Sequence, residues 1–177
     1  MINTVVSEKV IAFQGELGAN SHLACQEAYS DMQVLPCHTF EDVFESVAKG
    51  RAYLAMIPIE NSVAGRVADI HYLLPDSGLF IVGEHFQRVH HCLLAKTGTD
   101  INNIEKVYSH IQALSQCRKN LRALGIKPEP FTDTAGAAKQ ISEQEFSTTG
   151  AIASEFAAEI YGLDVVRRDI EDSGHNI

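Results

Sequence analysis

The sequence has few of the features that mark several classes of protein. Its four cysteines, Cys25, Cys37, Cys92 and Cys117, are widely spaced and form no C-x-x-C pair, which argues against a disulfide framework and against a zinc ribbon. No apolar run approaches the roughly 20 residues of a membrane-spanning helix, and residues 1–4 lack the basic flank of a secretory signal. No repeat or low-complexity segment occurs. We therefore expect a cytoplasmic protein with reduced thiols.

Positive charge is also scarce. The chain has 14 Lys and Arg against 23 Asp and Glu, and its net charge of −9 argues against nucleic acid and anionic membranes as partners. The 177 residues, of which 45% are hydrophobic, can bury one substantial core or two small ones.

Two clusters of histidine and cysteine, Cys37-His38 and His90-His91-Cys92, raise the question of a metal site. Adjacent residues of a strand point to opposite faces, so either cluster would need distant partners to complete four ligands. We therefore expect ordinary packing at both places, and neither a metal nor a cofactor.

Strand-like and helix-like runs alternate along the chain, which predicts an α/β protein with mostly parallel sheet. Thr39, with Asp42 three residues later, predicts the start of a helix. The expected strands include 10–14, 33–36, 53–57, 79–83, 89–95 and 106–108, and the expected helices include 20–29, 40–48 and 67–74.

The most informative segment follows the apolar run 53–57, which fits a central parallel strand ended by Pro58. Glu60, Asn61 and Ser62 are then expected in the connecting turn, at the sheet edge where α/β proteins place their sites. A simpler interpretation is that Asn61 and Ser62 only cap the helix that follows.

Two further segments repeat this arrangement. The strand 106–108 runs into Ser109-His110-Ile111-Gln112-Ala113-Leu114-Ser115-Gln116, which gathers hydroxyl, imidazole and amide groups where a strand becomes a helix. The segment Asp133-Thr134-Ala135-Gly136 opens another helix with small residues, which allow backbone N–H groups to approach an anion.

These segments, with Gly15 to Ser21 near the start and Ala151 to Ser154 near the end, closely resemble the prephenate dehydratase family over essentially the whole chain. The Pro-Ile-Glu-Asn-Ser motif (58–62) followed by Ser-His-x-Gln-Ala (109–113) is the most specific part. The resemblance implies a lyase of phenylalanine biosynthesis that converts prephenate to phenylpyruvate in the cytoplasm, without a cofactor.

The resemblance also implies two lobes of periplasmic-binding-protein type II, joined by two crossing segments, with the active site in the cleft between them. We place 1–84 with 166–177 in one lobe and 85–165 in the other. A homodimer or homotetramer is expected.

The resemblance and the chemistry of the motifs together suggest the site residues. The expected catalytic residues are Asn61, Ser62, Ser109 and Gln116. The expected substrate-binding residues are Ser21, Glu60, His110, Gln112, Ala113, Thr134 and Ala135. For His110, a general acid and a residue that caps the loop remain equal alternatives, and Glu60 either touches substrate, orients Asn61 or pairs with Arg66.

The sequence departs from the family pattern in three places. Glu16 and Ala19-Asn20 replace the usual residues of the opening motif, and Asp133 precedes Thr134 where the family has Ser. The family continues after the segment 170–176 and one variable residue with Thr-Arg-Phe, whose Thr is most associated with catalysis, and then with a regulatory ACT domain. The sequence ends at Ile177, so we expect a trimmed chain without either feature and without a phenylalanine response.

Two alternatives remain open. An arogenate dehydratase or a dual-specificity cyclohexadienyl dehydratase would perform the same elimination on a substrate with an amino group in place of the ketone. A non-catalytic, two-lobed anion-binding domain would use the same helix N-termini.

Overall fold

A computed structural model describes residues 9–144, 148–174 and 176–177. The chain divides into two compact units. Unit 1 comprises 1–16, 20–87 and 177, and unit 2 comprises 17–19 and 88–176. Residues 1–4, in which we find no secretory signal, lie outside the described residues.

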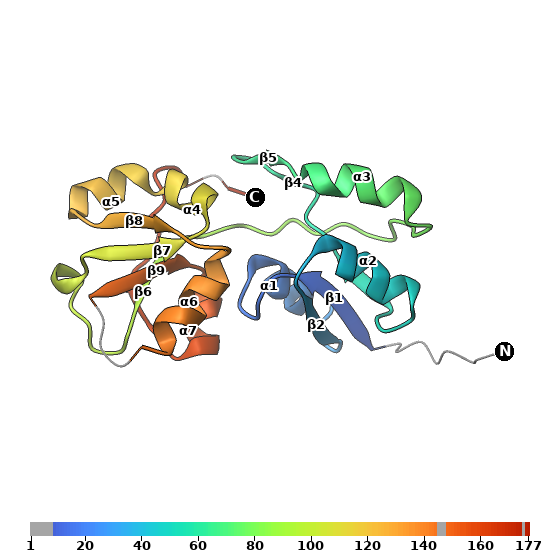
Figure 1. Ribbon diagram of the computed structural model, residues 1–177, viewed down its shortest axis with the longest axis horizontal. Coiled ribbons are helices and arrows are strands. Elements are labelled where there is room, and N and C mark those ends of the chain that lie inside the picture. Colours follow the sequence, from blue (N-terminus) through green and yellow to red (C-terminus); the bar gives the residue numbers. More distant parts are fainter. Residues whose placement is uncertain (1–8, 145–147, 175) are drawn as a thin grey trace. The chain divides into compact units, whose positions relative to one another are not determined.

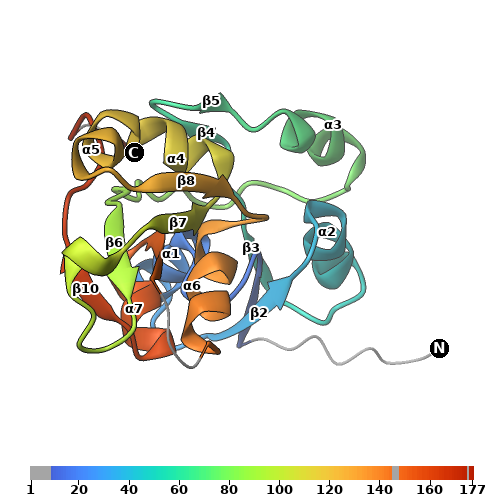
Figure 2. The same ribbon diagram turned by 60° about the vertical axis from the view of Figure 1, so that its left-hand side comes forward.

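Unit 1 is built on a small parallel sheet in the order β2-β1-β3. Figure 1 labels β1 and β2, and Figure 2 labels β3. Ala12 of β1 packs with Val43 of α2, whereas Phe13 stacks on His22 of α1. Because successive residues of a strand point to opposite faces, α1 and α2 cover opposite faces of the sheet. The elements are β1 (Val10–Gln14), α1 (Asn20–Ala28), β2 (Gln33–Cys37), α2 (Phe40–Ala48), β3 (Leu54–Met56), β4 (Glu60–Asn61), β5 (Gly65–Arg66) and α3 (Ala68–Asp76).

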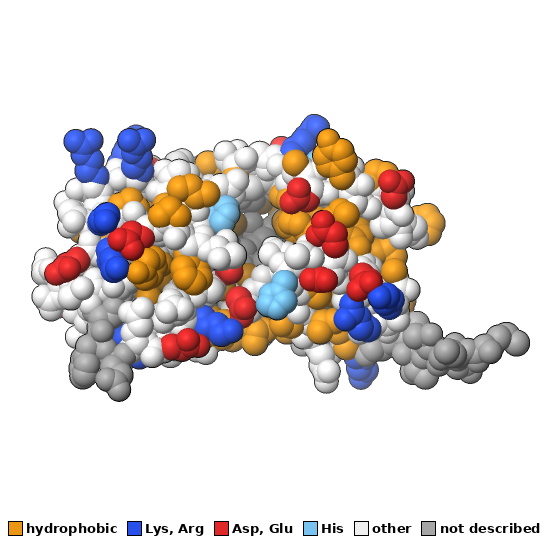
Figure 3. All heavy atoms as spheres, in the orientation of Figure 1, with side chains coloured by type: hydrophobic (Ala, Val, Ile, Leu, Met, Phe, Trp, Pro, Cys, Tyr) orange, Lys and Arg blue, Asp and Glu red, His pale blue; other side chains and the backbone are white. Residues whose placement is uncertain are grey.

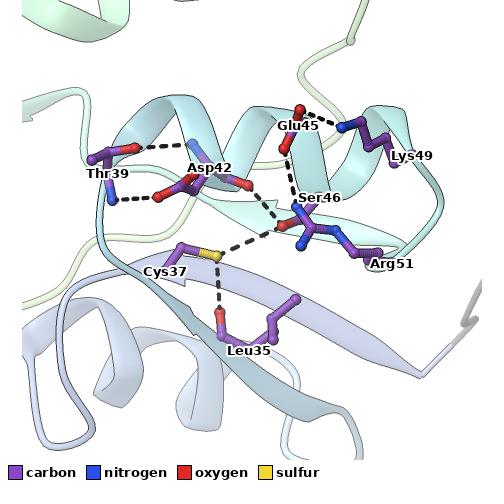
Figure 4. A network of polar contacts seen from close by, with 8 residues as sticks. All are labelled: Leu35, Cys37, Thr39, Asp42, Glu45, Ser46, Lys49 and Arg51. Atoms are coloured by element: carbon purple, nitrogen blue, oxygen red, sulfur yellow. Dashed lines mark hydrogen bonds and ion pairs between the residues drawn. The ribbon is translucent and has the colours of Figure 1, made fainter.

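The start of α2 confirms the helix signal at Thr39 (Figure 4). The Asp42 backbone N–H donates to Thr39 Oγ1 at 3.1 Å, and the Thr39 N–H donates to the Asp42 carboxylate at 3.2 Å. Further along the helix, Ser46 Oγ donates to the Asp42 carbonyl at 2.7 Å, and Glu45 pairs with Lys49. This reciprocal cap satisfies two backbone donors that a helix start otherwise leaves unpaired.

Unit 2 is built on a five-stranded mixed sheet in the order β10-β6-β9-β7-β8. Strands β7, β8 and β9 are parallel, and β6 runs antiparallel to both β9 and β10. The elements are β6 (Cys92–Ala95), a 3-10 helix η1 (Ile101–Asn103), β7 (Lys106–Ser109), α4 (Ile111–Gln116), α5 (Arg118–Leu124), β8 (Lys127–Pro130), α6 (Thr134–Ser142), β9 (Thr149–Ala153), α7 (Glu155–Tyr161) and β10 (Asp164–Arg167).

The alternation of side chains divides unit 2 into two cores, one on each face of the sheet. Leu93 and Ile152 pack with residues of α4 and α5, whereas Leu94 and Ala151 pack with residues of α6 and α7. Figures 1 and 2 show these two helix pairs on opposite sides of the sheet. The fully buried strands β6 and β9 therefore lie between two helical layers.

Residues 17–19 are grouped with unit 2 although the segments on either side belong to unit 1. Ser154 Oγ donates to the Gly18 carbonyl at 3.0 Å, and the Tyr161 hydroxyl donates to the Leu17 carbonyl at 2.7 Å. Gly18 has φ +88° and would bring a Cβ within 3.0 Å of the Ala157 backbone. This turn therefore requires glycine.

Three structural predictions need correction. The order β2-β1-β3 puts β1, and not the strand near 53–57, in the middle of the unit 1 sheet. The expected strand at 79–83 has no regular secondary structure. The segment that we placed in the first lobe from residue 166 onward begins within β10, which pairs with β6 of unit 2. Apolar composition alone does not distinguish an exposed extended connection from a strand. The remaining lobe boundaries stay a prediction.

All four cysteines are free, and Cys25, Cys92 and Cys117 are buried. Burial raises the pKa of the Cys25 thiol to about 12. Burial, assisted by the nearby carboxylates of Glu171 and Asp172, raises the pKa of Cys117 to about 12 as well. Both thiols therefore stay protonated and unreactive near neutral pH. Among the described residues, no helix has the length and apolar content to cross a membrane.

Candidate functional site

The polar segment of unit 1 forms a short hairpin in which β4 and β5 pair antiparallel. Asn61 Oδ1 accepts from the Val63 N–H at 3.0 Å and from the Ala64 N–H at 2.8 Å, which closes the turn. Gly65 completes it with φ +83°. The simple connecting turn expected from the sequence is therefore wrong. The expected helix cap is wrong as well, because the N-cap of α3 is Val67, which makes no side-chain capping bond.

The other predicted residues of unit 1 are less constrained by contacts. Glu60 is exposed and lies opposite Arg66 in the hairpin. Ser62 Oγ accepts from the Ile177 N–H at 3.0 Å. Ser21 lies in the first turn of α1 and is half-buried.

In unit 2, the strand-to-helix transition at Ser109 and His110 matches the predicted position. Ser109 is fully buried at the end of β7, and its hydroxyl donates to the Ile152 carbonyl at 2.6 Å. His110 is the N-cap of α4, and its Nδ1 accepts from the Gln112 N–H at 3.3 Å. The Ser109 proton thus links two strands, and His110 has the capping contact that was one of its two alternatives.

Gln116, at the end of α4, is held by residues far away in the sequence. Its Oε1 lies 2.7 Å from His91 Nε2 and accepts from Asn176 Nδ2 at 2.9 Å. Because an amide oxygen can only accept, the contact with Gln116 Oε1 requires the His91 tautomer that carries its hydrogen on Nε2. Burial lowers the pKa of His91, which favours the same neutral ring. No hydrogen bond of the Gln116 NH2 group occurs among the described residues, so this group can act as a neutral donor to a ligand.

Asn176 is 3% exposed and takes part in this network only through its amide nitrogen. Its Oδ1 is buried without a hydrogen-bond partner in the part of the chain that the structure describes. Buried carbonyl oxygens normally accept a hydrogen bond, so Asn176 Oδ1 is a candidate acceptor for a ligand or for a further residue.

Behind Gln116, the segment 170–172 anchors the helices of unit 2. The Asp172 N–H donates to the Gln116 carbonyl at 2.7 Å, and the Asp172 carboxylate accepts from the N–H groups of Lys119 and Asn120 at 2.9 and 3.1 Å. Asp172 therefore caps α5 from about 50 residues away in the sequence. The Glu171 carboxylate accepts from the His91 N–H at 3.1 Å.

The start of α6 differs from the expected anion site. Asp133 is the N-cap, and its carboxylate accepts from the Gly136 N–H at 2.6 Å. A Cβ on Gly136 would lie 2.8 Å from that carboxylate. Thr134 is half-buried and Ala135 is buried in the first turn. The helix N-terminus already holds a negative charge, so it is a poorer site for a substrate carboxylate than the sequence suggested.

The predicted site residues fall into two groups. Unit 1 carries Ser21, Glu60, Asn61 and Ser62, and unit 2 carries Ser109, His110, Gln112, Ala113, Gln116, Thr134 and Ala135. Within unit 2, Ala113 is buried, and Gln112 is exposed on α4, four residues before Gln116. His91 and Asn176 were missed as partners of Gln116, although the motif that contains Asn176 was recognised.

Comparison with known proteins identifies the family of this chain. The sequence profile of the family "Prephenate dehydratase" matches residues 11–177. This chain belongs to the prephenate dehydratase family. It is 49% identical over 169 residues to the bifunctional N-acyl-homoserine lactone acylase/prephenate dehydratase of Komagataeibacter europaeus, which covers 96% of this chain and 60% of that protein. It is 44% identical to arogenate dehydratase/prephenate dehydratase 2 of Arabidopsis thaliana, a chloroplastic protein, over 94% of this chain and 44% of that protein.

Solved structures of prephenate dehydratases agree with the fold. The structure of prephenate dehydratase from Arthrobacter aurescens in complex with L-Phe has a TM-score of 0.84 and 28% identity, over 93% of this chain and 56% of that one. The mixed α/β class and the periplasmic-binding-protein type II-like fold expected for this prephenate dehydratase family member are confirmed. The chain spans 60% or less of the length of these relatives. It is a member of a lyase family.

Proposed function

We propose that this chain carries the catalytic domain of a prephenate dehydratase, which converts prephenate to phenylpyruvate, carbon dioxide and water. The observation that carries the proposal is the fixed orientation of Gln116, whose Oε1 is held by His91 and Asn176. This leaves a neutral amide donor at the end of the family's Ser-His-x-Gln-Ala helix.

A neutral donor suits this reaction. The bond from the ring to its carboxylate breaks and its electrons enter the ring, while the bond from the ring to the hydroxyl breaks and that oxygen leaves as water after taking a proton. Aromatisation supplies the driving force, so the enzyme must orient the ring and deliver one proton. Gln116, Asn61 and Ser62 can orient oxygens without the strong clamp that a cation would place on the departing carboxylate.

The substrate is a dianion, so local positive potential must offset the net charge of −9. The start of α6 is occupied by Asp133, which weakens it for this purpose. The short helix α5, by contrast, carries Arg118, Lys119 and Arg122, all exposed. Figure 3 shows Lys and Arg side chains at the upper left of the surface, where Figure 1 places α5. We assign attraction of the substrate chiefly to such basic side chains in unit 2.

The test compares prephenate and arogenate as substrates for this chain and for a version extended through Thr-Arg-Phe. We expect phenylpyruvate from prephenate above the uncatalysed background in the extended form, with a lower kcat/KM for arogenate. Gln116→Leu should lower this activity, whereas Gln140→Leu, an exposed change on α6, should not. Equal rates on the two substrates would establish a dual-specificity cyclohexadienyl dehydratase. Binding of prephenate without turnover in both forms would instead favour the anion-binding domain.

A second activity is a candidate because of one relative. The Komagataeibacter protein, 49% identical, is named as an N-acyl-homoserine lactone acylase as well as a prephenate dehydratase. An N-acyl-homoserine lactone should therefore be included as a third substrate, with release of the fatty acid as the measured product. Among the candidate residues of unit 2, Ser109 is a poor acylase nucleophile because it is fully buried and its hydroxyl is bonded to Ile152.

The assembly and location of the protein also belong to this proposal. A homodimer or homotetramer is supported by large exposed apolar side chains on and after α3, namely Tyr72, Phe80, Ile81, Val82 and Phe86. Light scattering of the purified chain tests this. A cytoplasmic location is proposed as well, and the relatives include a chloroplastic protein.

A further inference from the structure

Three ligand-type side chains, none of them among the residues assigned to prephenate, meet at one edge of unit 2. His90 precedes β6, and Asp169 and Glu171 follow β10. The pairing of these antiparallel strands continues beyond β10, because the Ile170 N–H donates to the His91 carbonyl at 2.9 Å. The fold therefore brings residues about 80 positions apart into contact.

The separations within this group fit a shared ion. His90 Nδ1 lies 2.9 Å from Asp169 Oδ1 and 3.7 Å from Glu171 Oε1, and one ligand atom from each residue lies within 4.8 Å of the others. Two ligands bound tetrahedrally at zinc, with bonds near 2.0–2.1 Å, are about 3.3 Å apart. The two separations from His90 lie on either side of this value, and the Asp169 and Glu171 oxygens lie within 4.8 Å of each other.

Glu171 is the fixed member of the group. Its side chain is 5% exposed, and its Oε2 accepts from the His91 N–H while Oε1 faces His90. Backbone support of this kind orients a ligating carboxylate before the metal arrives. The side chains of His90 and Asp169 are 45% and 70% exposed, which gives an ion access and allows water to complete its coordination.

We propose that His90, Asp169 and Glu171 form a binding site for a divalent transition metal of the Zn²⁺ class. An imidazole nitrogen and carboxylate oxygens are ordinary zinc ligands, and two carboxylates with a neutral imidazole balance the charge of the ion. The sequence argument against a metal at His90-His91-Cys92 required distant partners, and the fold supplies two of them to His90. The proposal is independent of the dehydratase activity.

The competing interpretation is an ion pair in which a protonated His90 is held by the two carboxylates without a metal. The experiment titrates metal-free chain, with any affinity tag removed, with Zn²⁺ at neutral pH by calorimetry. A parallel titration with Co²⁺ reads the ligand type from visible absorption. We expect one equivalent of Zn²⁺ to bind, and a Co²⁺ spectrum without thiolate charge-transfer bands.

The variants assign the ligands. His90→Ala and Asp169→Asn alter exposed side chains and should each weaken Zn²⁺ binding at least about 10-fold. The control is His85→Ala, since His85 pairs with the single carboxylate of Glu27 at 3.2 Å and lies in unit 1. This change should leave the affinity unaltered. Absence of Zn²⁺ binding by the unmodified chain, or affinity retained in both His90→Ala and Asp169→Asn, would overturn the proposal and leave the ion pair.

Discussion

The two units present their polar motif residues in different ways. In unit 1, Asn61 bonds to the backbone two and three residues away, inside a hairpin whose side chains are largely exposed. In unit 2, Gln116 is bonded to side chains 25 and 60 residues away, and its partners His91 and Asn176 are buried. The first arrangement is set by local turn chemistry, and the second depends on the tertiary fold.

This difference predicts how each unit tolerates change. A local turn can lose one contact at little cost to the rest of the unit. A buried network leaves several donors without partners when one member is removed, and each unpaired group carries its own desolvation cost. Mutations in the two segments should therefore separate effects on activity from effects on stability.

The largest effect is expected from Gln116→Leu. This change removes the acceptor of His91 Nε2 and Asn176 Nδ2 and should lower the free energy of unfolding by about 2–4 kcal/mol. Urea unfolding followed by circular dichroism measures the loss, and hydrogen exchange should show it in unit 2 rather than unit 1. Gln140→Leu, on the exposed face of α6, is the matched control and should stay within about 0.5 kcal/mol of the original. Equal stability of the two variants would contradict the network.

The second largest loss of stability is expected from Asp172→Ala. Loss of the carboxylate removes the cap from the N–H groups of Lys119 and Asn120 and should cost about 1–2 kcal/mol. Faster hydrogen exchange of the first turn of α5 is the specific signature. Asp172→Asn keeps an oxygen acceptor and should recover most of the stability, so a loss as large as that of Asp172→Ala would mean that charge, and not capping, matters here.

Unit 1 offers a pH-dependent counterpart at His22, whose pKa is lowered by burial against Phe13. The unfolded chain, with a pKa near 6.5, then binds more protons than the folded one. The contribution is present in full above pH 6.5 and is lost as pH falls toward the folded pKa, with a limiting slope of about 1.4 kcal/mol per pH unit. Unfolding measured from pH 7.5 to 5 should show a shallower slope for His22→Gln than for the original chain, and an equal slope would contradict this assignment.

The smallest effect on stability is expected at Asn61. Asn61→Asp keeps an oxygen that accepts from Val63 and Ala64 but lacks the NH2 donor, so stability should change by less than about 0.5 kcal/mol. If Asn61 orients substrate, kcat/KM for prephenate in the extended chain should still fall about 10-fold or more. If kcat/KM changes as little as stability does, Asn61 has a purely structural role.

Local signals explain how far the sequence could go. The start of the helix at 40–48 was predicted correctly because the two residues of its capping box, Thr39 and Asp42, lie close together in the sequence. Gln116 was identified from the resemblance to the family, because hydrophobic periodicity predicts helices and strands but not which polar residues form a site. The partners His91 and Asp172 could not be found in this way, because the antiparallel pairing of β10 with β6 and the bulge after Val165 decide which residues meet. Asp133, by contrast, could be found from the sequence alone. It stands where the family has Ser, and this difference predicted a carboxylate at the start of the helix.

The turn at 17–19 has a consequence for the order of folding. Its bonds from Ser154 and Tyr161 close loops of 136 and 144 residues. Closing a loop of this length costs about 4 kcal/mol in the logarithmic entropy term alone, and contacts so distant in sequence slow folding. On the ribosome, residues 17–19 can therefore join unit 2 only after Ser154 and Tyr161 have been synthesised. Until then, residues 17–19 lack these two bonds and are exposed to proteases and to other chains.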